Sequence, residues 1–99
     1  MSTDGLAPES DRVRAFWRRY IAYLKTQSVP LAALPWFRRH VEAFIAAHPD
    51  DRLQAIEADQ VTQYLDALGR DSPLRDWQLI QVVEALRHLF CGIVDARWC

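Results

Sequence analysis

The chain has few of the features that support a membrane, disulfide-rich or metal-stabilised architecture. It contains only two cysteines and three glycines in 99 residues. No apolar run approaches the roughly 20 residues that a transmembrane helix needs. Residues 1–5 (MSTDG) lack the basic and apolar regions of a signal peptide. We therefore expect a cytoplasmic protein with no membrane partner.

The two cysteines do not form the paired pattern of a disulfide framework. Cys91 falls within a helical pattern, which predicts a small, half-buried apolar side chain. Glycine-rich phosphate loops, Cys-x-x-Cys pairs and His-Glu-x-x-His helices are absent from the sequence. His88 and Cys91 are three residues apart, but a closed zinc site requires four ligands. We therefore expect no metal, no cofactor and no catalytic residue in this chain.

What the chain does have is apolar content and segregated charge. Its 51% of hydrophobic residues is enough for one packed domain, and its net charge is −1. Residues 11–40 carry seven basic side chains against one acidic one, a net charge of +6. Residues 41–71 carry two basic side chains against seven acidic ones, a net charge of −5. Such a dipolar surface can steer a polyanion to one face of the molecule.

Apolar residues recur three and four positions apart in four stretches, which predicts helices and no strands. The expected helices cover residues 10–27, 35–47, 57–68 and a last stretch from 72–76 to 94. Proline restricts the residue before it and breaks the pattern between helices, and Gly69 is the expected stop of the third helix. The prediction is an all-α domain, a compact four-helix orthogonal bundle over residues 10–95, with a disordered tail at 1–9 and a linker starting at 96–99.

The helical period also predicts which side chains form the core. In the fourth helix the expected buried face is Leu79, Val83, Leu86, Phe90 and Ile93, with Val82 beside it. The opposite, exposed face of that helix is expected to carry Trp77, Gln81, Glu84 and His88. In the other helices the expected core residues are Val13, Phe16, Trp17, Tyr20, Ile21, Leu24, Phe37, Val41, Phe44, Ile45, Val61, Tyr64, Leu65 and Leu68.

Three surfaces are candidates for binding. The first, at the start of the second helix, has Trp36, Arg38, Arg39 and His40. Guanidinium groups pair with phosphates and an indole packs on sugars or bases, whereas the alternative is an ordinary solvated helix face.

The second candidate surface lies on the fourth helix and contains Arg75, Trp77, Gln78, Gln81 and His88. A helix fits the major groove, where glutamine can bond adenine N6 and N7 together. The alternative is that Trp77 packs against another helix, and Glu84 on the same face opposes approach to phosphates.

The third candidate surface consists of Arg14, Arg18 and Lys25 on one flank of the first helix. Each can reach the backbone of a duplex that runs alongside. The alternative is a purely solubilising role, which is usual for surface charges without aromatic or amide neighbours.

The order of three motifs resembles a known family. These are residues 37–45 (FRRHVEAFI), Val61-x-x-Tyr64-Leu65-x-x-Leu68, and residues 81–90 (QVVEALRHLF). Together they resemble the N-terminal core-binding domain of tyrosine recombinases, the phage-integrase type with a SAM-like four-helix fold. The segments PWF at 35–37, DWQ at 76–78 and LFC at 89–91 are most similar to integron-type integrases. The resemblance covers roughly Phe16 to Val94.

The resemblance implies one arm of a clamp around a recombination site, with helices of this domain against the major groove. Its partners are then duplex DNA, a C-terminal catalytic domain of the parent chain and further protomers on the DNA. The catalytic arginine, histidine and tyrosine residues of the family belong to that second domain, so this part performs no bond chemistry. The predicted DNA-binding residues are Lys25, Trp36, Arg38, Arg39, His40, Arg75, Trp77, Gln78 and Gln81.

The chain departs from the family at two places. Pro30 and Ala33 stand near positions where members often have serine and threonine, and Gln78 replaces a common threonine. The rival hypothesis is a helical protein-interaction module that docks a partner through Trp36, Trp77 or Trp98, because aromatic anchors suit that role.

Overall fold

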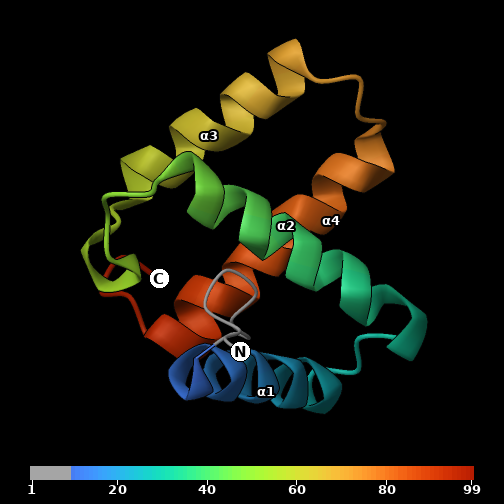
Figure 1. Ribbon diagram of the computed structural model, residues 1–99. Coiled ribbons are helices and arrows are strands. Elements are labelled where there is room, and N and C mark those ends of the chain that lie inside the picture. The colour runs from blue at the N-terminus through green and yellow to red at the C-terminus, as the bar shows by residue number, and fades with distance from the viewer. Residues whose placement is uncertain (1–9) are drawn as a thin grey trace, which may run out of the picture.

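The computed structural model describes residues 10–99 of the chain. This part contains four α-helices and no β-strand. The predicted disordered tail at 1–9 lies outside these residues. Short 3₁₀ turns precede α2 and α3, and a π-helical segment, η4, continues α4 (Figure 1). The elements are α1 (Asp11–Thr26), η2 (Leu31–Ala33), α2 (Leu34–Ala47), η3 (Leu53–Ala55), α3 (Ala58–Asp71), α4 (Asp76–Arg87) and η4 (His88–Val94).

The first helix begins and ends as its sequence predicts. The Ser10 hydroxyl caps it by accepting a hydrogen bond from the Val13 amide at 3.2 Å. The chain leaves the helix through Ser28, which has a positive φ of 62°. Trp17, Tyr20 and Leu24 belong to the core, but Val13 is 41% exposed and lines a surface groove between α1 and α2.

The second helix begins at Leu34 with Pro35 in its first turn, where a missing amide proton costs nothing. Its buried residues are Leu34, Phe37, Val41 and Phe44. His48 ends it, with Nδ1 2.9 Å from the Phe44 carbonyl oxygen and its ring stacked on Phe44 at 4.2 Å.

The prediction that α3 stops at Gly69 is wrong. The helix passes through Gly69 and ends at Asp71, and Ser72 adopts an extended conformation. Pro73 disfavours a helical conformation for Ser72, so proline rather than glycine sets this boundary. A Cβ at Gly69 would meet Leu79 at 3.6 Å, an ordinary contact.

The predicted buried face of α4 is wrong in two respects. Val83 is 38% exposed, and His88, expected on the solvent face, is only 7% exposed. The reason is that α4 and η4 contact all three other helices, so the buried face is wider than one stripe. The buried residues are Val82, Ala85, Leu86, His88, Leu89 and Phe90.

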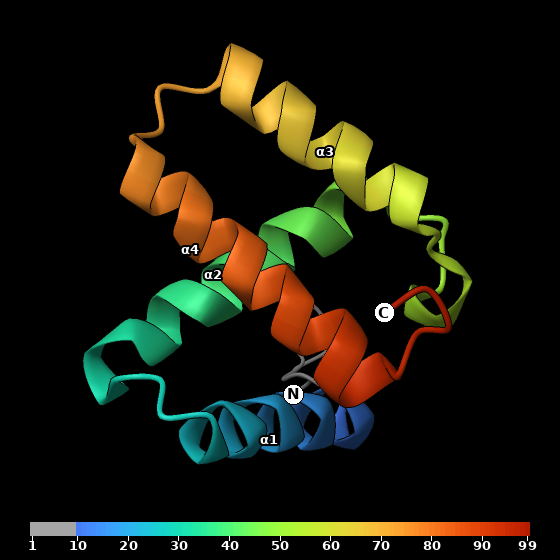
Figure 2. The ribbon, with the colours of Figure 1, turned by 180° about the vertical axis from the view of Figure 1, so that it is seen from behind.

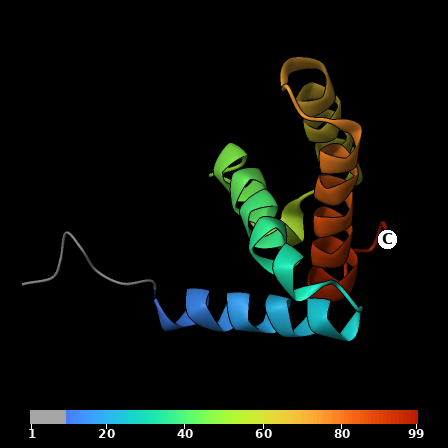
Figure 3. The same cartoon turned by 90° about the vertical axis from the view of Figure 1, so that its right-hand side faces the viewer.

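The four helices form a bundle around α4. Helix α1 lies across one end of both α2 and α4, which rise from it (Figure 3). Helices α2 and α4 cross, and both begin on the same side of that crossing, the right in Figure 1 and the left in Figure 2. Among residues 10–99, no helix is both long and apolar enough to cross a membrane.

The cysteine pattern does not predict a disulfide, but the structure contains one. Cys91 and Cys99 form a disulfide with their Cα atoms 5.5 Å apart. Asp95 ends η4 in a left-handed conformation, with a φ of 59°, and turns the chain back so that residue 99 returns to residue 91. Both cysteines are exposed rather than half-buried.

The C-terminal residues 96–99 lie against the domain. The Trp98 indole Nε1 donates a hydrogen bond to the Ile56 carbonyl oxygen at 3.0 Å, and its ring is 5.3 Å from Phe90. A linker beginning in this segment stays a prediction, but these residues are packed where one was expected to start.

Candidate nucleic-acid interface

A hydrogen bond joins α2 to α4 at the centre of the predicted DNA-binding surface. His40 Nε2 lies 2.8 Å from Gln81 Oε1. His40 belongs to the first candidate surface and Gln81 to the second. The fold thus brings together two surfaces that are 41 residues apart in sequence.

An exposed tryptophan lies one turn before each member of this pair. Trp36 precedes His40 and is 52% exposed, and Trp77 precedes Gln81 and is 61% exposed. The Arg39 guanidinium carbon lies 5.2 Å from the Trp36 ring centroid. The arrangement offers aromatic faces and a cation around two hydrogen-bonding side chains, which suits contacts to sugars, bases and phosphates. We call Trp36, Arg39, His40, Trp77 and Gln81 the crossing face.

Arg38 does not belong to the crossing face, although the sequence grouped it there. Arg38 and His40 are two positions apart in sequence, which corresponds to a rotation of about 200° around the helix. Its guanidinium carbon lies 4.6 Å from the Trp17 ring centroid of α1, and its Nε is 3.1 Å from Glu42 Oε2. Arg38 therefore turns toward α1 rather than α4.

Arg38 instead joins the third candidate surface. A surface groove of about 480 Å³ between α1 and α2 has four basic side chains in its lining. Its described lining residues include no carboxylate, although Arg14 pairs with Asp11 and Arg38 with Glu42 nearby. We call this the basic groove, and its lining is Arg14, Trp17, Arg18, Ile21, Ala22, Lys25 and Arg38.

The basic groove contains two arginines that the sequence did not place among the predicted DNA-binding residues. Arg14 and Arg18 carried only a weak expectation of contact with DNA, and Lys25 alone of the three was among the predicted DNA-binding residues. A helical wheel of α1 does place the three on one flank. It cannot show that α2 supplies a fourth cation from the other side, because that depends on how the helices pack.

Arg75 and Gln78 have a local structural role. The Gln78 Oε1 accepts a hydrogen bond from the Arg75 amide at 2.8 Å, which satisfies a free N–H at the start of α4. Both residues lie at the helix end that begins on the same side as α2 (Figure 1). The partial positive charge at these two helix N-termini favours an anion there.

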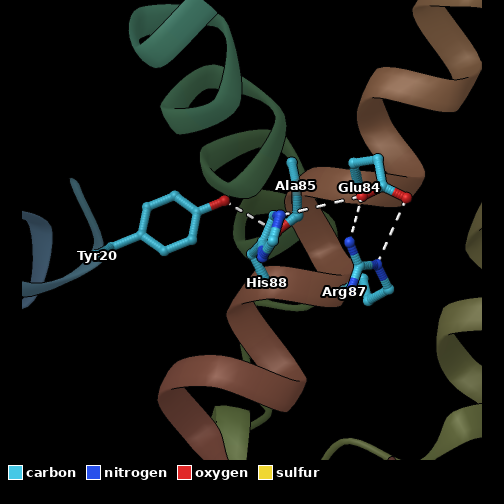
Figure 4. Close-up of polar contacts among 5 residues, drawn as sticks. All are labelled: Tyr20, Glu84, Ala85, Arg87 and His88. Atoms are coloured by element: carbon cyan, nitrogen blue, oxygen red, sulfur yellow. Dashed lines mark hydrogen bonds and ion pairs between the residues drawn. The ribbon is translucent and has the colours of Figure 1, made fainter. Parts of the chain in front are cut away.

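α4 carries two carboxylates, Asp76 in its first turn and Glu84 near its end, and Arg87 forms an ion pair with Glu84 (Figure 4). The hydrogen bond from Arg87 lowers the pKa of the Glu84 carboxyl group. Because the two charges balance, the α4 surface repels phosphates less than the sequence predicts.

His88 is part of the core and not of the second candidate surface. Its ring lies 5.7 Å from Tyr23 of α1 and 6.4 Å from Phe37 of α2. Burial, together with the nearby Arg87 charge, lowers the pKa of the His88 imidazole, and Glu84 at 3.9 Å only partly opposes this. Only 7% of His88 is exposed.

Two further observations bear on other functions. Among residues 10–99, no three His, Cys, Asp or Glu side chains are grouped so as to hold a metal ion. Trp98, which the rival hypothesis names as an anchor for a protein partner, is partly buried against Phe90.

Comparison of the chain with protein-family models, with curated proteins and with solved structures gives no match.

Proposed function

We propose that this chain is a DNA-binding domain that holds duplex DNA with the crossing face in the major groove and the basic groove against the backbone. The observation that carries the proposal is the His40–Gln81 hydrogen bond at 2.8 Å, which unites the two surfaces with the chemistry of base and phosphate contact. Trp36 and Trp77 flank it on the two helices.

Charge distribution supports this orientation. Residues 11–40, which form α1 and the start of α2, hold a net charge of +6, and the basic groove is formed by these two helices. The acidic residues 41–71 include α3, which lies on the other side of α4 from α1. A duplex that approaches α1 and α2 meets the positive end of this charge separation.

The sequence resemblance makes the proposal more specific. We propose that the bundle is a SAM-like core-binding domain of a cytoplasmic tyrosine recombinase of the integron or phage-integrase type. In that proposal a C-terminal catalytic domain of the parent chain supplies the bond chemistry, and several protomers assemble on the recombination site. This domain then acts as one arm of a clamp: it binds the DNA and takes no part in catalysis.

The second candidate function is a protein-interaction module. Its supporting observation is the apolar outer surface of α4, where Trp77 and Ile80 are 61% and 62% exposed. Adjacent large apolar groups at such exposure mark docking sites in other proteins.

A duplex titration at two salt concentrations tests the main proposal. A fluorescently labelled duplex is titrated with the wild-type chain, with Arg39→Ala and with Arg70→Ala as a matched control on α3. Arg70 is exposed and lies 4.0 Å from Asp71, so its loss removes one surface cation that belongs to neither the crossing face nor the basic groove. Arg39→Ala is expected to weaken binding and to reduce the salt dependence by about one phosphate contact, whereas Arg70→Ala leaves both unchanged. Absence of duplex binding at low salt, or equal effects of the two variants, would overturn the proposal.

A further inference from the structure

The C-terminal disulfide borders an apolar recess between α3 and α4. The recess has a volume of about 210 Å³, and Cys91 and Trp98 belong to its lining. Val61 and Leu65 of α3 and Phe90 of η4 line it as well. The Trp98 ring lies 5.3 Å from Phe90, which is only 1% exposed. Trp98 therefore shields part of this apolar surface from water.

The segment that carries Trp98 follows an unfavourable turn. Asp95 has a φ of 59°, a left-handed conformation that glycine adopts more easily than residues with a side chain. The Ala96 amide donates a hydrogen bond to the Phe90 carbonyl oxygen at 2.9 Å, and Trp98 Nε1 donates one to the Ile56 carbonyl oxygen at 3.0 Å. The disulfide adds a covalent restraint to these contacts, since it fixes the residue next to Trp98.

The disulfide is accessible, and it is local. Cys91 and Cys99 are both exposed, so the thiolate of a reductant can reach their sulfur atoms. They are eight residues apart, and the bond joins η4 to the segment that directly follows it. It connects no two of the helices α1 to α4, and neither cysteine belongs to the buried core. Cleavage of the bond therefore leaves the packing of the helices in place.

We propose that the Cys91–Cys99 pair is a redox-sensitive switch that controls the exposure of the apolar recess. In the disulfide form Trp98 is held against Phe90. A dithiol reductant transfers two electrons and two protons to the pair through a mixed disulfide, so that both cysteines become thiols and the dithiol becomes a disulfide. The segment 96–99 then leaves the domain and uncovers the recess. This switch does not rest on the proposed function, because it involves no residue of the crossing face or the basic groove.

Amide hydrogen exchange and the binding of anilinonaphthalene sulfonate, a dye that fluoresces on apolar surfaces, test the switch. Both are measured on the oxidised chain and after addition of dithiothreitol. Exchange at the Ala96 amide is expected to become roughly 10- to 100-fold faster on reduction, because the restraint of the closed loop is lost. Dye fluorescence is expected to rise, and the Leu24 amide of α1 is expected to keep its protection. Reoxidation should reverse both changes.

Two variants separate the restraint from the side chain that it holds. The double variant Cys91→Ser, Cys99→Ser is expected to show fast exchange at Ala96 and high dye binding with or without the reductant. Trp98→Ala keeps the disulfide, so exchange at Ala96 should still respond to the reductant. Its dye binding is expected to be high in both states, because the shielding indole is absent.

Three results would overturn the switch. One is an Ala96 amide whose exchange is the same before and after reduction, and another is dye binding that reduction does not change. The third is a loss of the helical circular dichroism signal or of Leu24 protection on reduction. That loss would show that the disulfide supports the whole domain rather than the position of Trp98.

Discussion

The Tyr20 hydroxyl donates a hydrogen bond to the Ala85 carbonyl oxygen at 2.8 Å and thereby fastens α1 to α4 (Figure 4). Both residues are fully buried. The bond lies one turn before the helix changes to its π-helical segment η4, at the centre of the bundle. The position of α1, and so of the basic groove, depends on this contact.

Removal of that hydroxyl is expected to destabilise the domain. Tyr20→Phe keeps the ring but leaves the buried Ala85 carbonyl oxygen without its side-chain donor, which costs about 1–2 kcal/mol. Urea unfolding monitored by circular dichroism measures the change. Tyr23→Phe is the matched control, since no hydrogen bond of that hydroxyl is seen among residues 10–99. Equal losses in the two variants would contradict a specific role for the Tyr20 bond.

Acid is expected to destabilise the domain through His88. Burial lowers the pKa of this imidazole in the folded state, while the unfolded chain keeps the ordinary value of about 6.5. The unfolded state therefore binds more protons below that pH. The stability due to neutral His88 is complete above about pH 6.5 and decreases as the pH falls toward the folded-state pKa, by at most about 1.4 kcal/mol per pH unit.

Urea unfolding between pH 7.5 and pH 5 measures this slope. In His88→Gln the decline over this interval is expected to flatten, even if the variant is less stable throughout. The readout is the slope, because a merely structural substitution lowers the whole curve without changing its dependence on pH. An unchanged slope would show that another group causes the acid sensitivity.

Reduction of the Cys91–Cys99 disulfide is expected to release the C-terminal segment. The disulfide closes a short loop, and cross-links of this length contribute about 2–3 kcal/mol by restricting the unfolded chain. Dithiothreitol is expected to lower the unfolding midpoint and to expose the Trp98 indole, seen as a red shift of its fluorescence. Trp98→Phe identifies that signal among the four tryptophans. A double Cys91→Ser, Cys99→Ser variant is the control and should not respond to the reductant.

The sequence predicts the helices here better than it predicts their contacts. Apolar periodicity located α1 and α2 to within a residue or two, because each buries one face. It misjudged Val83 and His88, because the exposed side of α4 carries the apolar residues Ile80 and Val83 while the buried side includes His88. The disulfide was missed because it depends on one left-handed residue, Asp95, that reverses the chain.

In the candidate site, too, the sequence predicts the residues of each helix but not the contacts between helices. Residue chemistry identified His40 and Gln81 on separate helices, but only the packing places them 2.8 Å apart. The same packing moves Arg38 away from them and into the basic groove. Local periodicity describes the faces of one helix at a time and has no information on the crossing of two.

The basic groove is expected to contact the duplex backbone without reading its sequence. Arg18→Ala and Lys25→Ala each remove one cation from the groove lining. Each is expected to weaken binding to all duplexes about equally and to reduce the slope of log K against log salt by about one unit, because phosphate contacts release counterions. Titration of two unrelated duplexes over a range of salt concentrations measures both effects. Arg52→Ala, an exposed arginine outside both surfaces, is the control. A loss confined to one duplex would assign Arg18 or Lys25 to base recognition, and a loss equal to that of Arg52→Ala would remove the groove from the interface.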